Sequence, residues 1–102
     1  MKDSWDMIWL SRDHNPSIPE EKQRIMKSGG RIEASKYPDG SRRGPKRIWR
    51  KMEDVPGLMM SRSFGDRVGH SCGIISTPEV KVFQREESHK CLVLGSDGMW
   101  EV

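Results

Sequence analysis

The residues best suited to chemistry lie near the end of the sequence, where a short apolar run meets a carboxylate. Cys91 to Leu94 is unbroken apolar sequence, which is typical of a strand that is buried on both faces. Asp97 follows it between Gly95 and Gly98, so a ligand can approach its carboxylate closely. Hard divalent cations prefer such oxygen ligands. Asp97 is therefore a candidate metal ligand.

A second carboxylate stands close by, because Glu101 follows Asp97 by four residues. A helical turn that starts at Gly98 would bring the two side chains to one side. The alternative is that Ser96 to Gly98 form an ordinary turn, in which the backbone satisfies the Asp97 carboxylate. These residues alone leave both interpretations open.

The composition describes one small domain with little material for a core. The chain has 102 residues, of which 33% are hydrophobic and 32% are charged. No stretch approaches the length of a membrane span, and no signal-like apolar segment follows Met1. Cys72 and Cys91 form no Cys-x-x-Cys pair, so we expect two reduced thiols in an intracellular protein, cytoplasmic or nuclear.

Positive charge is concentrated in one segment of the chain. Between residues 35 and 51, seven basic residues stand against a single acid, Asp39, which gives a local charge of +6, whereas the remainder carries −3. This imbalance predicts an anionic partner for the segment. No recognisable nucleic-acid module surrounds it, so we expect no nucleic-acid binding. The basic residues are Lys36, Arg42, Arg43, Lys46, Arg47, Arg50 and Lys51.

Local patterns predict a helix early in the chain. Ser17 and Glu20 have the spacing of a capping box, and the helix should run to about Ser28, with Glu20 spaced to pair with Arg24. Gly29 and the glycine after it supply a left-handed end.

Other elements are predicted to be short. A second helix is expected from Leu58 to Asp66, stopped at Gly65, and residues 34–55 are expected to form a long irregular segment. Strands are expected at residues 5–10, 31–33, 74–75, 79–84 and 91–94.

Several familiar catalytic patterns are missing from the sequence. No Gly-x-Ser-x-Gly elbow is present, neither cysteine is followed by an Arg within six residues, and the Cys and His residues lack zinc-ligand spacing. His14 fits a turn better than a catalytic base.

Six motifs, taken in order, carry a family resemblance. The chain resembles the C-terminal half of the catalytic domain of the protein phosphatase 2C family, the metal-dependent protein serine/threonine phosphatases, in forms similar to plant and protist members. The motifs are Leu10 to Pro16, a helix ending in Gly29 to Ile32, Gly44 to Trp49, Pro56 to Asp66, Thr77 to Val80 and Leu94 to Val102.

This resemblance implies part of an α+β sandwich, in which two antiparallel sheets are flanked by helices. It also implies a binuclear Mn²⁺ or Mg²⁺ centre that activates water for attack on phosphoserine or phosphothreonine in protein substrates. Asp97 matches a metal-ligating aspartate of the family. Glu101 falls at a further metal position, where the family usually has Asp.

The resemblance assigns other residues to supporting and substrate-facing roles. Arg62, Asp66, Asp13, His14 and Gly98 lie in supporting motifs. Residues 35–57 correspond to the family's flap beside the active site, and the basic side chains expected to face the substrate there are Arg42, Arg43, Lys46 and Arg47.

Three motifs of the family do not occur in this sequence. They are an Asp-Gly-His-Gly-Gly metal motif, a phosphate-binding Arg and an Asp-Asn metal motif. We therefore expect residues 1–102 to be a partial phosphatase 2C-like catalytic domain, a fragment that is inactive alone. The alternative is a non-catalytic phosphatase-like module that binds an anionic or phosphorylated partner.

Overall fold

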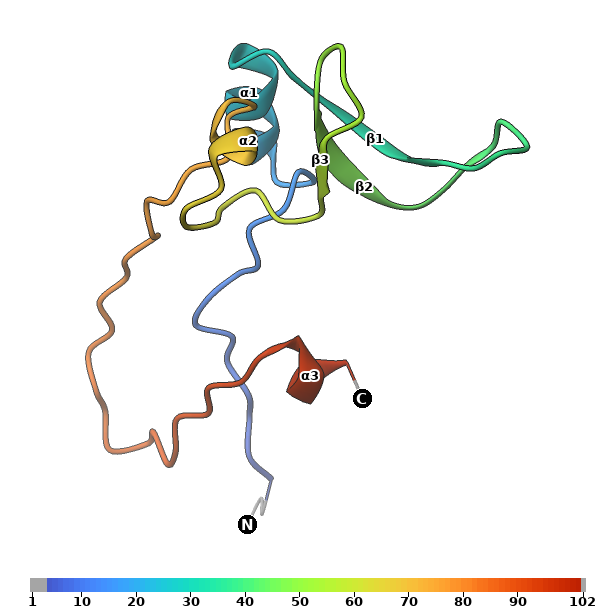
Figure 1. Ribbon diagram of the computed structural model, residues 1–102. Coiled ribbons are helices and arrows are strands. Elements are labelled where there is room, and N and C mark those ends of the chain that lie inside the picture. Colours follow the sequence, from blue (N-terminus) through green and yellow to red (C-terminus); the bar gives the residue numbers. More distant parts are fainter. Residues whose placement is uncertain (1–3, 102) are drawn as a thin grey trace.

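The computed structural model, which describes residues 4–101, contains a three-stranded antiparallel sheet at one end of the molecule (Figure 1). Its strands are β1 (Gly30–Lys36), β2 (Arg42–Arg50) and β3 (Pro56–Leu58), and β2 lies in the middle. The β1–β2 hairpin projects away from the helices (Figure 1). The predicted strand at residues 31–33 is confirmed as part of β1.

The irregular segment predicted for residues 34–55 is wrong at 34–36 and 42–50, which pair as β1 and β2, and is confirmed at 37–41 and 51–55. Two features of β2 hid it from the sequence pattern. Its outward positions carry Lys and Arg rather than apolar residues. The register also shifts between Ala34 and Ser35, where Gly44 and Pro45 of β2 add two extra residues and interrupt the alternation.

The first helix, α1, spans Pro19–Lys27, with Ile18 at its N-cap and no side-chain cap. The predicted Ser17 capping box is therefore wrong. The Asn15 side chain starts the turn instead, since its Oδ1 accepts a hydrogen bond from the Ser17 backbone at 2.9 Å. The predicted end is confirmed, because Ser28 is the C-cap and Gly29 has a φ of +84°.

A second helix, α2 (Arg67–His70), begins later than predicted. The expected helix from Leu58 to Asp66 is wrong, because Leu58 ends β3 and only the residues after Asp66 are helical. Residues 74–75 form no strand but a single parallel bridge between Ile75 and Arg62.

The hydrophobic core is small and lies between α1, the sheet and the loop after α2. Its buried members are Ile25, Ile48, Cys72 and Ile74, with Ile32 and Leu58 packed against them. This mixture of helices and an antiparallel sheet confirms the α+β prediction, with a single sheet in residues 4–101. In the same residues, no helix is both long and apolar enough to cross a membrane.

Three predicted strands, at residues 5–10, 79–84 and 91–94, are wrong: each is extended but unpaired. The prediction that Cys91 to Leu94 is buried is also wrong, because Leu94 is 83% exposed. An apolar run becomes a buried strand only when a neighbouring strand satisfies its backbone, and none does so within the described residues. The resulting radius of gyration, 17.7 Å, exceeds the roughly 13 Å of a compact domain of this length.

Gly57 offers a test of how the sheet packs. Both Gly57 and Gly40 have a positive φ, +73° and +85°, but only at Gly57 would a Cβ meet a side chain, with the Trp49 ring at 2.8 Å. We expect Gly57→Ala to lower the free energy of unfolding by about 1–3 kcal/mol more than Gly40→Ala, because it adds overpacking to the shared backbone strain. Urea unfolding of both variants measures the difference. Equal losses would show that Trp49 does not hold this position.

Candidate functional site

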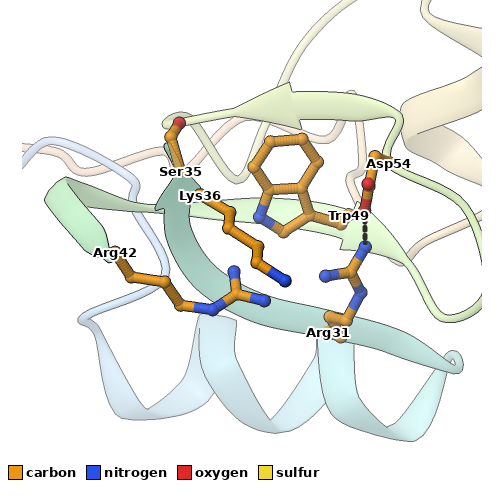
Figure 2. A pocket seen from close by; sticks show the side chains of 6 residues that line it. All are labelled: Arg31, Ser35, Lys36, Arg42, Trp49 and Asp54. Atoms are coloured by element: carbon orange, nitrogen blue, oxygen red, sulfur yellow. Dashed lines mark hydrogen bonds and ion pairs between the residues drawn. The ribbon is translucent and has the colours of Figure 1, made fainter. Parts of the chain in front are cut away.

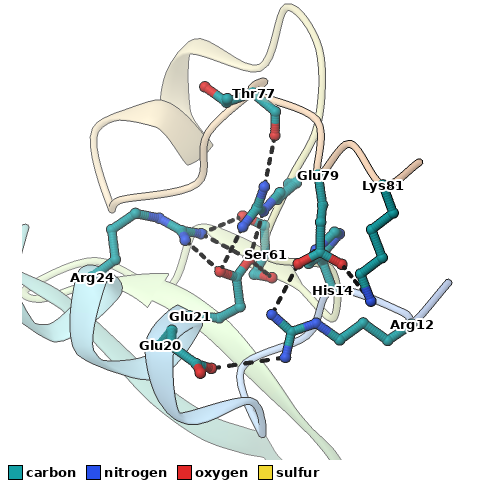
Figure 3. Close-up of polar contacts among 10 residues, drawn as sticks. Arg12, His14, Glu20, Glu21, Arg24, Ser61, Thr77, Glu79 and Lys81 are labelled. Atoms are coloured by element: carbon teal, nitrogen blue, oxygen red, sulfur yellow. Dashed lines mark hydrogen bonds and ion pairs between the residues drawn. The ribbon is translucent and has the colours of Figure 1, made fainter. Parts of the chain in front are cut away.

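A buried carboxylate, Glu21 of α1, is the centre of the best-connected polar cluster (Figure 3). Only 1% of its surface is exposed. Arg62 binds it through two contacts, Nε to Oε1 at 2.8 Å and Nη2 to Oε2 at 3.0 Å. Arg24 donates to it at 2.5 and 3.2 Å, and the Ser61 hydroxyl donates at 2.8 Å. Hydrogen bonding from Arg62 holds the pKa of Glu21 well below its usual range, against the effect of burial.

The two guanidinium groups also tie Glu21 to distant parts of the chain. Arg24 donates to the carbonyls of Ser61 and Gly73, at 2.9 and 2.8 Å. Arg62 donates to the carbonyl of Thr77 at 2.8 Å. The cluster therefore joins α1 to residues 61–62 and to residues 73–77. Arg62, which was predicted to lie in a supporting motif, forms a structural ion pair with Glu21.

The predicted pairing of Arg24 with Glu20 is wrong, because Arg24 pairs with Glu21. Glu20 has its side chain 70% exposed and comes within 3.9 Å of Arg12. Glu21 is the partner because it precedes Ile25 by four residues, which places both side chains on the face of α1 that packs on the core. The i, i+3 spacing of Glu21 and Arg24 was the available signal.

A second, more exposed cluster surrounds Glu79 (Figure 3). Its carboxylate accepts a hydrogen bond from Arg12 at 3.0 Å and lies 3.7 Å from the Lys81 amine. The hydrogen bond from Arg12 is the main reason that the pKa of Glu79 lies below its usual range. His14 Nε2 lies 3.9 Å from this carboxylate, and the His14 carbonyl accepts a hydrogen bond from Ser61 at 3.1 Å. The two clusters therefore meet at His14 and Ser61.

The remaining supporting residues lie in separate places. Asp66 caps α2, since its Oδ1 accepts a hydrogen bond from the Gly69 backbone at 2.9 Å. Asp13 is exposed in the irregular segment before α1. Gly98 lies within α3 (Asp97–Trp100).

The two candidate metal ligands lie at opposite ends of α3, a helical turn that begins at Asp97, one residue before the start considered from the sequence. Asp97 is its first residue and Glu101 its C-cap, and both are exposed. The helix is held by Trp100, whose indole donates to the Gly95 carbonyl at 2.8 Å and packs edge-on against Trp9 at 5.5 Å.

These two carboxylates suit a hard cation by donor type, because both offer oxygen ligands. They are too few to hold it alone, since Mg²⁺ and Mn²⁺ are coordinated by about six ligands. Residues 4–101 contain no group of three or more Asp, Glu, His or Cys side chains placed to share an ion. Further ligands would have to join Asp97 and Glu101 to complete a site.

The four predicted substrate-facing basic residues all lie on β2 but do not form one patch. Arg42 contacts the Ala34 carbonyl at 2.9 Å, and Arg43 stacks on the Tyr37 ring at 4.0 Å. Arg47 is half-buried and donates to the Gly57 carbonyl at 2.8 Å. The fourth, Lys46, lies with Ile32 in a separate hollow beside the start of α1.

Comparison with known proteins assigns the chain to a family. The model of the family described as Protein phosphatase 2C matches residues 3–102. The chain belongs to the protein phosphatase 2C family.

Plant proteins are among its similar relatives. Probable protein phosphatase 2C 61 of Arabidopsis thaliana is 43% identical over 93 residues, which cover 91% of this chain and 27% of the relative. Probable protein phosphatase 2C 73 of Oryza sativa subsp. japonica is 39% identical over 102 residues, which cover 99% and 23%. The chain thus spans about a quarter of the length of these relatives. No solved structure matches significantly.

The ion pairs of Glu21 predict a specific dependence of stability on pH. A carboxyl with a depressed pKa in the folded state adds stability above its unfolded pKa, near 4.5, and loses it as the pH falls further. We expect wild type to be more stable than Glu21→Gln by a constant amount above about pH 5, and the difference to shrink steadily towards pH 2. Urea unfolding across this range measures it, with Glu20→Gln as the exposed control. A difference that does not change with pH would contradict the pairing.

Proposed function

We propose that this chain is part of the catalytic domain of a metal-dependent phosphatase that removes phosphate from serine and threonine side chains of proteins. The observation that carries the proposal is the family match, which extends over residues 3–102. The Asp97 motif at the start of α3 agrees with it, because it presents an exposed carboxylate at a helical turn.

In this proposal Asp97 is a primary ligand of a binuclear Mn²⁺ or Mg²⁺ centre, and Glu101 contributes to a further, weaker metal position. Such an ion lowers the pKa of bound water and offsets negative charge on phosphoryl oxygens. The further ligands that the centre requires are not supplied by residues 4–101. Both carboxylates are exposed, which leaves them accessible to such an ion and to further ligands.

The other residues of the proposed site act by positioning and by charge. The Glu21 cluster fixes Ser61 and Arg62, while Asp66 fixes the start of α2. The flap of residues 35–57 brings a charge of +6 between residues 35 and 51, which attracts acidic or multiply phosphorylated segments over about 8 Å at physiological salt. Arg42, Arg43, Lys46 and Arg47 would carry that attraction.

The partner and compartment follow from the same proposal. The substrates are phosphorylated proteins rather than nucleic acids. Cys72 and Cys91 are free thiols, which supports an intracellular, cytoplasmic or nuclear setting.

A second candidate function is a non-catalytic phosphatase-like module that binds an anionic partner. One observation favours it: residues 4–101 supply no complete metal-ligand set, whereas the basic hairpin is formed. An activity measurement distinguishes the two candidates.

The activity test is a chimera in which residues 1–102 replace the matching segment of the Arabidopsis relative. We expect the chimera to hydrolyse a phosphoserine peptide with added Mn²⁺. Asp97→Asn should lower kcat by more than the roughly 10–100-fold typical of residues that only support a ligand. Glu101→Gln should do less, because it touches only the weaker position. Steady-state kinetics and metal titration measure both.

Two outcomes would contradict these roles. Comparable losses from both variants would show that Asp97 and Glu101 are not a primary and a secondary ligand. A folded chimera that is inactive, while the unmodified relative is active, would favour the non-catalytic module.

A further inference from the structure

The face of the hairpin that carries Trp49 contains a small pocket with several cationic groups (Figure 2). Its volume is about 240 Å³. This is below the range of roughly 300–1,000 Å³ that is usual for drug-sized ligands, so it suits a single side chain rather than a cofactor. The lining residues are Arg31, Ser35, Lys36, Arg42, Trp49 and Asp54.

Three cationic side chains converge beneath the Trp49 indole. The Lys36 amine lies between the guanidinium groups of Arg42 and Arg31 in the close view (Figure 2). Like charges gathered in this way repel one another unless anions lie among them. Negative charge, from within the chain or from a ligand, would relieve this repulsion.

The chain supplies only part of that negative charge. Glu33 bridges two of the cations, with its Oε2 at 2.5 Å from Arg31 Nη1 and 3.0 Å from Arg42 Nη1. Asp54 Oδ1 lies 2.6 Å from Arg31 Nη2. Two carboxylates thus face three cations, and within residues 4–101 Lys36 makes no ion pair. These five groups therefore leave the pocket with a net charge of +1.

Trp49 gives this pocket a fixed wall. Its indole Nε1 donates to the Glu33 carbonyl at 2.8 Å, and Arg31 lies over the ring at 5.6 Å. Gly57 also lies close to the ring, since a Cβ built there would come within 2.8 Å of it. A ring held by these contacts loses little freedom when a ligand binds, which favours affinity.

We propose that this pocket binds one acidic group, a carboxylate or a phosphate, on a peptide segment of the protein substrate. The Lys36 amine would meet the anion, Arg42 would flank it, and the methylene groups of the ligand would pack on Trp49. This inference rests on the proposed phosphatase function for the identity of the partner. It adds Arg31 and Trp49 to the basic segment, and it gives Lys36 of that segment a direct contact with the ligand.

The binding test titrates the ¹⁵N-labelled chain with an acidic phosphoserine peptide and with the same peptide carrying Gln for Glu and Ser for phosphoserine. The Trp49 indole N–H, assigned through Trp49→Phe, is the local probe. We expect the acidic peptide to shift this resonance and the neutral peptide to leave it in place. Lys36→Gln should weaken binding roughly fivefold, the weight of one charge-assisted contact at a partly exposed site.

Lys51→Gln is the matched control, because it removes the same charge from the same basic segment but does not line the pocket. We expect it to change affinity by less than about twofold, a surface-charge effect. Equal weakening by Lys36→Gln and Lys51→Gln would overturn the pocket in favour of diffuse attraction. Tighter binding of a single-stranded oligonucleotide at Trp49 would overturn the choice of partner. An unshifted indole N–H in ligand-free Lys36→Gln establishes that the hairpin is intact.

A second measurement separates this inference from the proposed function. In the active chimera, Lys36→Gln should raise KM for the acidic peptide severalfold without lowering kcat, because the pocket binds away from the reacting phosphate. Peptide binding at Trp49 in a chimera that lacks activity would uphold the pocket and contradict the phosphatase proposal. An active chimera whose Trp49 resonance does not respond to the peptide would uphold the phosphatase proposal and contradict the pocket.

Discussion

The burial of a single carboxylate, Glu21, constrains how the rest of this chain is arranged. An ionised group taken out of water costs several kcal/mol unless it is paired and hydrogen-bonded. Arg24, Arg62 and Ser61 meet that requirement, and two of them, Ser61 and Arg62, come from a segment distant in sequence from α1. The small core around Ile25 depends on the same arrangement, because Glu21 and Ile25 share one face of α1.

The β1–β2 hairpin also depends on ion pairing, but its charged side chains are more exposed. A strand rich in Lys and Arg repels itself, and Glu33 offsets part of that repulsion by bridging Arg31 and Arg42. These ion pairs hold Arg31 and Arg42 in place beside Trp49, whereas Lys36 makes no ion pair within residues 4–101. Binding of an anionic segment at this face then gains from charge that the fold has already oriented. The basic residues of the hairpin therefore account both for the electrostatics of the sheet and for its proposed role in recognition.

Sequence reasoning predicted those features that depend on neighbouring residues. The end of α1 follows from a glycine that adopts a positive φ, and the turn at Asp97 follows from local chemistry. Sequence reasoning failed where the structure of a segment depends on partners that are distant in sequence. β2 is a strand because β1 pairs with it, whereas residues 91–94 are exposed because no strand pairs with them in residues 4–101. The choice of Glu21 over Glu20 likewise required knowing which face of α1 meets Ile25.

The central claim, that the Glu21–Arg62 pair holds the segments together, is tested most directly by a double-mutant cycle. Glu21→Gln, Arg62→Gln and the double variant would be compared with wild type by urea unfolding at pH 7. Since the two side chains meet through two contacts at 2.8 and 3.0 Å, we expect a coupling energy of about 1–3 kcal/mol. Losses that add within about 0.3–0.5 kcal/mol would show that the pair is not coupled and would contradict the account.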